Sequence, residues 1–186
     1  MVPLWKDLNP GPTGRIPDVI HVVVEVPKGS NAKYEVDKET GAFFLNRDLF
    51  TSMVYPGDYG FIPQTISEDE DALDALVLVS QPHTTGIVIT ARPIGVLRME
   101  DEHGKDDKII CVPINKIDPK FRNYKDIKDL PSLFITEIKH FFNRYKEIEP
   151  GKWIKVEKIE CAETAKKVIL KSIEKYEKEC KKELDF

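Results

Sequence analysis

The segment SEDEDALDALVLV, residues 67–79, places five carboxylates within seven residues, directly before an apolar run. Three of them, Asp69, Asp71 and Asp74, are aspartates, whose short side chains hold their oxygens close to the backbone. Asp74 adjoins the apolar run and should lie at the edge of the core, where an unpaired charge is costly. The charged side chains of a loop usually lie in solvent. The position of Asp74 at the edge of the core instead favours a site where the aspartates face a positively charged group or ion.

A second pair of aspartates, Asp101 and Asp106, brackets a predicted tight turn around Gly104. The two ends of such a turn lie close together in space, so these carboxylates can face one partner. The chain therefore carries two separate groups of short acidic side chains, and we expect both groups to serve the same cation site.

The residue types indicate which cation the site would hold. An EF-hand needs ligands at loop positions 1, 3 and 5 and glycine at 6, whereas the first three aspartates fall at positions 1, 3 and 6. Zinc prefers His or Cys in ligand spacing, and the histidines are isolated: His21, His83, His103 and His140. Several carboxylates favour Mg²⁺ or Mn²⁺, and more aspartates than one ion needs indicate two or more ions, as in phosphoryl chemistry.

A phosphate site also needs hydrogen-bond donors, and the first candidates lie on a predicted hairpin. Lys33 and Glu35 are two residues apart on one strand and share a face, while Arg47 ends the partner strand. Glu25 lies in the middle of a valine-rich strand, where a buried carboxylate requires a cation or a strong hydrogen-bond partner.

Further candidates are phenolic or cationic. Tyr55 and Tyr59 flank Pro56–Gly57, a rigid turn that can aim both hydroxyls inward, and Tyr145 and Lys146 close a predicted helix. Taken singly, each is more often a core aromatic or a surface charge than a ligand. No other catalytic signature competes, because the sequence contains no GxGxxG, Walker loop, GxSxG, HExxH or CxxC.

Patterns of apolar and turn residues predict the elements that must position these side chains. Strands are predicted at 19–27, 73–79, 86–100, 108–114 and 152–159, with a hairpin at 32–47 and a shaped loop or short strand at 53–65. The segment 86–100 is predicted as one long strand or a bent pair, with Pro93 and Gly95 at the bend. Two helices are predicted at about 131–148 and 161–182, the first stopped by Gly151, and 1–16 should be an irregular arm. Consecutive strands followed by late helices favour an α+β fold with a barrel-like sheet.

Composition sets the limits of these interpretations. The length of 186 residues predicts a single catalytic domain over 1–186, and a net charge of −4 argues against polyanion binding by bulk electrostatics. Three widely spaced cysteines fit a reducing cytoplasm better than a disulfide framework. No signal-peptide core and no stretch of ~18 apolar residues is found, so we expect a cytoplasmic protein without a membrane partner.

Four ordered blocks, KYEVDKETG, YPGDYGFIPQT, DEDALD and FFNRYKEIEPGKWIKVE, together resemble soluble inorganic pyrophosphatases of the first family, the prokaryotic type. The resemblance runs from about Val22 to Glu160. It implies a five-stranded OB-like β-barrel with two α-helices, assembled as a homohexamer. It also implies Mg²⁺-dependent hydrolysis of pyrophosphate to two phosphates by a metal-activated water, with several Mg²⁺ ions per site and Mn²⁺ or Zn²⁺ as substitutes.

The resemblance further implies a role for each candidate residue. Asp71 would polarise the attacking water, and Tyr55 is counted with it among the catalytic residues, at a supporting position in the pocket. Glu35 would support the pocket. The implied metal ligands are Asp69, Asp74, Asp101, Asp106 and Glu25, with Asp74 shared between two ions. The implied phosphate-holding groups are Lys33, Arg47, Tyr59, Tyr145, Lys146 and Lys108.

Two positions depart from the family pattern, and three other functions stay open. Glu70 and Ala72 stand where the family usually has a small or Asp/Asn residue and then Pro or Glu, which leaves the shape of the acidic loop open. The alternatives are a nucleic-acid binder on an OB-like barrel, a Ca²⁺-binding or structural domain, and a related metal hydrolase acting on a nucleotide or polyphosphate. Acidic loops argue against the first, and the lack of an aromatic base pocket argues mildly against nucleotides.

Overall fold

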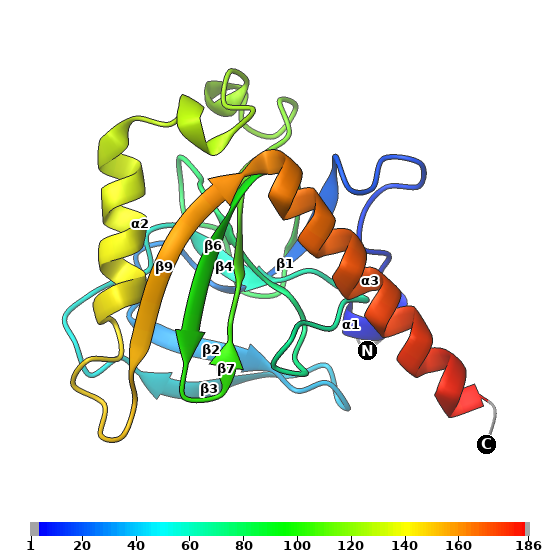
Figure 1. Ribbon diagram of the computed structural model, residues 1–186, viewed down its shortest axis with the longest axis horizontal. Helices are drawn as coiled ribbons and strands as arrows, with labels where there is room; N and C mark the ends of the chain where they lie inside the picture. The colour runs from blue at the N-terminus through cyan, green and yellow to red at the C-terminus, as the bar shows by residue number, and fades with distance from the viewer. Residues whose placement is uncertain (1–3, 185–186) are drawn as a thin grey trace.

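Strand pairing closes a small barrel, which the computed structural model describes over residues 4–184 (Figure 1). The barrel order is β1 (Ile20–Val26), β4 (Asp58–Phe61), β5 (Asp74–Val77), β8 (Lys108–Pro113) and β6 (Val88–Asp101). Strand β6 then pairs with β1, so five strands close on themselves. All of these pairings are antiparallel except that of β5 with β8, which is parallel. The predicted α+β fold with a five-stranded, OB-like barrel is confirmed.

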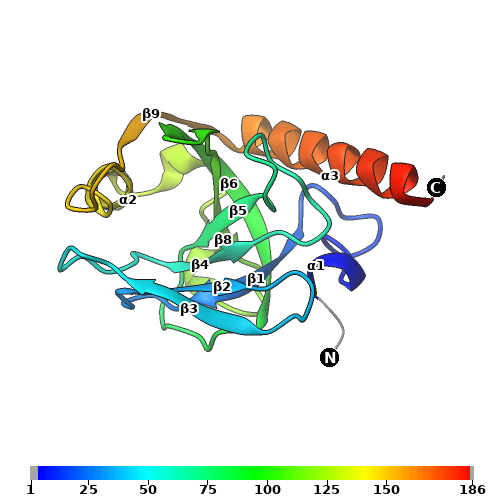
Figure 2. The same ribbon diagram turned by 90° about the horizontal axis from the view of Figure 1, so that it is seen from below.

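The long strand β6 serves several neighbours because it bends. Its pairing with β8 shifts register between Pro93 and Gly95, where the sequence predicts the bend. Before the bend β6 pairs with β1, and beyond it with β9 (Ile154–Cys161). Its end pairs with the short β7 (Gly104–Lys105). The predicted hairpin, β2 (Ala32–Val36) with β3 (Phe43–Asp48), forms a separate two-stranded sheet below the barrel (Figure 2).

Two long helices pack against the barrel in different places, α2 (Ser132–Arg144) and α3 (Ala162–Leu184) (Figure 1). Phe141 and Phe142 of α2 share a core cluster with Leu76 of β5. Ile169 of α3 shares a second cluster with Ala75, the neighbour of Leu76 along the same strand. Successive side chains of a strand point to opposite faces, so both faces of these strands are buried. This explains why the strand sequences are continuous apolar runs rather than alternating ones.

The helical regions differ in detail from the sequence-based expectation. The first long helix ends at Arg144 with Tyr145 as its C-cap, so Gly151 lies beyond it in a turn and does not stop the helix. A short helix, α1 (Leu4–Asp7), interrupts the arm expected to be irregular, where Trp5 packs edge-on against Tyr176 of α3. Two 3₁₀ turns precede α2, at Pro119–Phe121 and Ile127–Asp129. No helix within residues 4–184 combines the length and apolarity needed to cross a bilayer.

Strand β4 approaches β1 so closely that one position requires glycine. Gly60 pairs with Val24, and a Cβ added at Gly60 would lie 1.8 Å from the carbonyl oxygen of Val23. This clash involves rigid backbone rather than the end of a flexible side chain. The close approach matters for function because Tyr59, the residue before Gly60, lines the pocket described below.

Gly60→Ala should therefore destabilise the barrel, because the methyl group must push β4 away from β1. The expected loss in the free energy of unfolding is about 1–3 kcal/mol, the usual range for overpacking. Urea denaturation followed by circular dichroism measures this loss as a lower midpoint. The slope of the free energy of unfolding against urea concentration should stay unchanged. A midpoint equal to that of the unmodified protein would contradict this account of the β1–β4 contact.

Candidate active site

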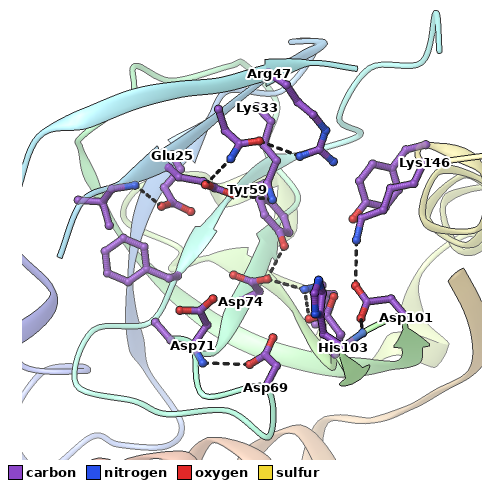
Figure 3. Close-up of a pocket in the computed structure, with 18 of the residues that line it drawn as sticks. Glu25, Lys33, Arg47, Tyr59, Asp69, Asp71, Asp74, Asp101, His103 and Lys146 are labelled. Atoms are coloured by element: carbon purple, nitrogen blue, oxygen red, sulfur yellow. Dashed lines mark hydrogen bonds and ion pairs between the residues drawn. The ribbon is translucent and has the colours of Figure 1, made fainter. Parts of the chain in front are cut away.

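A pocket of about 460 Å³ opens between the barrel, the β2–β3 hairpin and the end of α2 (Figure 3). The two acidic groups recognised in the sequence converge in it from separate segments. Every residue predicted for the site lines this pocket except Tyr55: Glu25, Lys33, Glu35, Arg47, Tyr59, Asp69, Asp71, Asp74, Asp101, Asp106, Lys108, Tyr145 and Lys146.

Lys108 lies between two of the carboxylates. The parallel pairing of β5 with β8 sets Asp74 opposite Lys108, whose Nζ donates hydrogen bonds to Asp74 and to Asp106. Burial alone would lower the pKa of Lys108, but the charges of Asp74 and Asp106 hold that pKa well above its ordinary value. The hydroxyl of Tyr59 also donates to Asp74, at 2.5 Å. Asp74 is thus fixed by two donors at the centre of the site.

The loop carrying the other two aspartates of the first group is held by α3. The backbone N–H of Asp71 donates to Asp69 at 3.1 Å, and burial raises the pKa of Asp69. Glu70, between them, has a positive φ of 67°. Lys175 of α3 donates to the carbonyl oxygen of Ser67 at 2.6 Å and to the Glu70 carboxylate at 2.8 Å. Glu70, one of the two residues that depart from the family pattern, is therefore an anchoring point of the loop outside the pocket, whereas the other, Ala72, lines the pocket.

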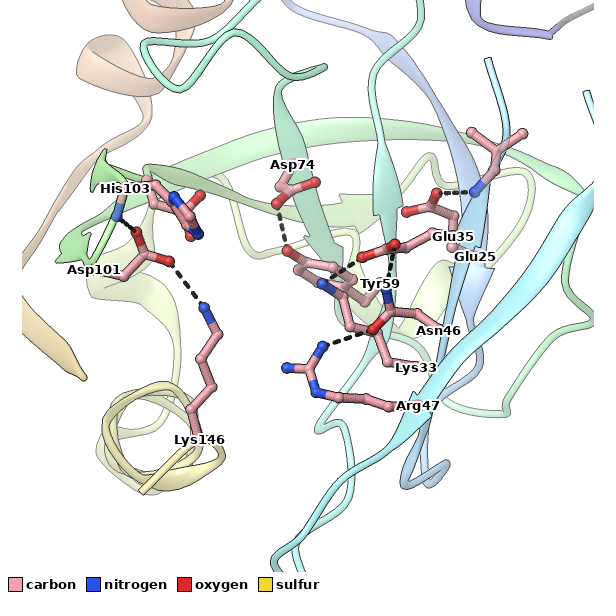
Figure 4. Close-up of polar contacts among 12 residues, drawn as sticks. Glu25, Lys33, Glu35, Asn46, Arg47, Tyr59, Asp74, Asp101, His103 and Lys146 are labelled. Atoms are coloured by element: carbon pink, nitrogen blue, oxygen red, sulfur yellow. Dashed lines mark hydrogen bonds and ion pairs between the residues drawn. The ribbon is translucent and has the colours of Figure 1, made fainter. Parts of the chain in front are cut away.

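Asp101 belongs to the second acidic group and faces α2 across the pocket (Figure 4). It is buried, and its carboxylate accepts hydrogen bonds from Nζ of Lys146 and from the backbone N–H of His103, both at 2.9 Å. Burial would raise the pKa of Asp101, but these two donors outweigh it and lower the pKa. Asp101 therefore remains a carboxylate despite its burial.

Glu25 is the buried carboxyl of the valine-rich strand β1, and its environment differs from that of Asp101. The backbone N–H of Val36 donates a hydrogen bond to Oε1 of Glu25, at 2.8 Å. Burial and, after it, the negative charge of Asp74 raise the pKa of Glu25 to about 8. Glu25 therefore ionises less readily than an ordinary glutamate, and an added cation beside it would favour its carboxylate form.

The wall opposite the aspartates is cationic and comes from the hairpin (Figure 4). Lys33 and Arg47 are paired across β2 and β3, as the sequence suggests. Lys33 forms an ion pair of 2.7 Å with Glu35, and Nε of Arg47 donates to Glu149 at 2.9 Å. The Nη2 atom of Arg47 is buried and has no acceptor among the described residues. The N–H groups of this nitrogen are therefore available to donate hydrogen bonds to a ligand.

Tyr55, which the resemblance counts with the catalytic residues in a supporting position, does not itself line the pocket. It is 2% exposed and packs against Tyr59, Phe141 and Tyr145, with ring centroids 5.2, 4.8 and 6.4 Å away. The Pro56–Gly57 turn separates two tyrosines that point to different depths. Tyr55 thus supports the side chains of Tyr59 and Tyr145 from behind.

Sequence reasoning missed several of the residues that line the pocket, among them Lys38, Asn46 and Glu149. Lys38 forms an ion pair with Asp71, Asn46 bridges Glu35 and Arg47, and Glu149 accepts from Arg47. Lys38 and Glu149 lie inside the sequence blocks that carry the family resemblance, so the blocks mark the right segments. Their charge alone could not identify them, because exposed lysines and glutamates are common along this chain.

The donor set decides whether the pocket suits a divalent cation. Its acidic ligands are all carboxylates, the hard oxygen donors that Mg²⁺ prefers. Within residues 4–184, no three acidic, His or Cys side chains are already close enough to hold an ion together. Mg²⁺ usually keeps several waters and binds one or two carboxylates directly, so the separated aspartates fit this ion. They do not fit a closed zinc site of nitrogen and sulfur ligands.

Comparison with known proteins identifies the family. The family model described as inorganic pyrophosphatase matches residues 22–177. The inorganic pyrophosphatase of Aquifex pyrophilus is 49% identical over 174 residues, which cover 94% of this chain and 97% of that protein. The one from Saccharolobus solfataricus is 51% identical over 165 residues, covering 89% and 96% of the two chains.

Solved structures agree with the sequence relatives. The crystal structure of inorganic pyrophosphatase from Thermus thermophilus superposes with a TM-score of 0.88 at 43% identity, covering 93% of this chain and 98% of that chain. The inorganic pyrophosphatase from Helicobacter pylori gives a TM-score of 0.85 at 49% identity, with coverage of 86% and 94%. The chain therefore belongs to the inorganic pyrophosphatase family.

Proposed function

We propose that this protein hydrolyses inorganic pyrophosphate to two phosphates, with Mg²⁺ as its divalent cation. The observation that carries the proposal is the convergence of two acidic segments and a cationic, phenolic wall on one pocket. The wall offers donors for phosphate oxygens, and the carboxylates offer ligands for the cations that accompany such a polyanion. Membership of the inorganic pyrophosphatase family supports the same reaction.

The aspartates would hold several Mg²⁺ ions, with Mn²⁺ or Zn²⁺ as substitutes. Asp69, Asp74 and Asp106 are assigned to the first ion, and Asp74 also to a second. Asp101 and Asp106 are assigned to an ion that arrives with the substrate, and Glu25 to a further one. When bound, a divalent ion lowers the pKa of a coordinated water toward the neutral range.

Asp71 is the proposed general base. Figure 3 shows its carboxylate facing the same pocket as Asp69 and Asp74. Its side chain is 72% exposed, so its oxygens are open to a water molecule in the pocket. In this role Asp71 takes or orients the proton of the attacking water, while the neighbouring Asp69 and Asp74 hold cations.

The phosphate groups would be held by the cationic and phenolic wall. Arg47 suits the departing phosphate, because its planar guanidinium can donate two parallel hydrogen bonds and its Nη2 has no acceptor within residues 4–184. Glu35 positions Lys33 through their ion pair. The complete proposed set is Lys33, Arg47, Tyr59, Lys108, Tyr145 and Lys146. Placement and charge supply most of the catalytic effect in such a reaction.

We further propose a homohexamer in a reducing cytoplasm, with neither nucleic acid nor a membrane as partner. Leu133 and Phe134 on the outer face of α2 are exposed, which supports a contact between subunits. The cysteines are unpaired, which supports a reducing compartment: Cys111, Cys161 and Cys180.

Phosphate release from pyrophosphate should require Mg²⁺, because the carboxylates and the polyanionic substrate repel one another without it. A colorimetric phosphate assay should show turnover with Mg²⁺, none with EDTA, and recovery when Mg²⁺ is restored in excess. ATP serves as the control substrate. Equal release in EDTA, or equal release from ATP, would contradict the proposed reaction.

Asp71→Asn should lower kcat by about 10²–10⁴-fold, the usual contribution of a general base, because an amide cannot accept the proton. The substitution preserves the shape of the side chain. The matched control is Glu68→Gln, which removes a neighbouring carboxylate that pairs with Lys171 and does not line the pocket. Near-normal kcat in Asp71→Asn, or an equal loss in the control, would rule out this role.

A further inference from the structure

Lys38 links the proposed base to the N-terminal segment. Its Nζ donates a hydrogen bond to Oδ1 of Asp71 at 2.5 Å. The same Nζ lies over the ring of Trp5, 4.9 Å from the ring centroid. Lys38 and Trp5 both line the pocket, so the contact is part of the site and not a remote surface pair.

The turn between β2 and β3 fixes the backbone that carries Lys38. The side chain of Asp37 accepts hydrogen bonds from the backbone N–H and the hydroxyl of Thr40, at 2.7 and 2.6 Å. The turn closes by two backbone hydrogen bonds of 2.8 Å, from Gly41 to Asp37 and from Asp37 to Ala42. Gly41 has a φ of 70°, a conformation that glycine adopts without strain. Lys38 therefore projects from a well-defined turn toward the acidic loop.

Trp5 is held just as specifically. Its carbonyl oxygen accepts from the backbone N–H of Gln64 at 2.9 Å, and the side chain of Gln64 donates to the carbonyl of Lys6 at 2.7 Å. The indole ring packs edge-on against Tyr176, with centroids 5.4 Å apart, where α1 lies beside α3 (Figure 1). The ring is thus a fixed platform at the edge of the pocket.

The contact of Lys38 with both Asp71 and Trp5 differs from an ordinary surface ion pair. Exposed pairs usually add little, since holding two flexible side chains in one geometry opposes their attraction. Here the aromatic face attracts the ammonium and limits its positions, and only 35% of the Lys38 side chain is exposed. The hydrogen bond engages one oxygen of Asp71 and leaves Oδ2 for another partner.

We propose that Lys38, seated on Trp5, is a positioning residue for Asp71, which it orients with Oδ2 toward the attacking water. This inference rests on the proposed function, in which Asp71 takes or orients the proton of that water. Lys38 itself need not touch pyrophosphate. The N-terminal segment thereby becomes part of the catalytic apparatus through a single ring.

Lys38→Met tests the role directly and should lower kcat by about 10- to 100-fold, the effect of a small misplacement of a reacting group. KM for pyrophosphate should stay unchanged, because Lys38 acts on the base and not on the substrate. The matched control is Lys6→Met. The Nζ of Lys6 also lies over Trp5, at 5.9 Å, but Lys6 does not line the pocket, so kcat should be kept.

Two further comparisons separate positioning from general damage. In an Asp71→Asn background, Lys38→Met should cause no additional loss of kcat, because both changes act through one group. Trp5→Phe, which keeps an aromatic face, should retain more activity than Trp5→Leu.

A spectroscopic measurement tests the link without turnover. The chain has two tryptophans, so Trp153→Phe leaves Trp5 as the sole reporter. In metal-free protein, Asp71→Asn should change the emission of Trp5, because Lys38 loses its partner and moves over the ring. The change should vanish when Lys38→Met is also present.

Several outcomes would overturn the inference. A raised KM with unchanged kcat in Lys38→Met would make Lys38 a substrate-binding group, and an equal loss in Lys6→Met would make the effect one of surface charge. If the emission of Trp5 did not change in Asp71→Asn, the physical link from Asp71 through Lys38 to Trp5 would be disproved. If the unmodified protein released no phosphate from pyrophosphate, the proposed function would fall first, and the positioning role with it.

Discussion

Gathering carboxylates in a partly enclosed pocket is unfavourable unless positive charge comes with them, and this constraint shapes the whole site. The parallel pairing of β5 with β8 meets it by setting Lys108 opposite Asp74, within reach of Asp106 as well. The turn that follows α2 supplies Lys146 to Asp101 in the same way. Without these two ammonium groups, the strand ends could not hold their acids so close together.

The barrel provides this arrangement because several of its strands, β1, β5, β6 and β8, reach the pocket at their ends. The bend in β6 allows one strand to close the barrel with β1 and then to carry Asp101 outward beside β9. The two helices contribute differently, since α2 ends at the pocket while Lys175 of α3 fastens the acidic loop from outside. Core packing and site geometry are therefore set by the same elements.

Local patterns predicted most of the fold, because strands buried on both faces and amphipathic helices leave clear periodicity. They also predicted which segments carry the site. How deeply each side chain is buried, and which side chains it contacts, could be predicted less well from the sequence. Tyr55 and Tyr59 flank the same turn, yet only the packing of α2 decides that Tyr55 lies behind the pocket. Lys38 meets Asp71 across 33 positions and Arg47 meets Glu149 across 102, and such pairings depend on the completed fold. The helix at Trp5 likewise depends on its contact with Tyr176.

The ammonium group between Asp74 and Asp106 also bears on how readily ions are exchanged. Any divalent ion that uses these oxygens must compete with a tethered cation that is always at hand. This competing ammonium group lowers the affinity of the two carboxylates for the ion, and it can pair with them again when the ion leaves. In the proposed reaction, such a site would release its ion more readily than one whose carboxylates had no ammonium group beside them.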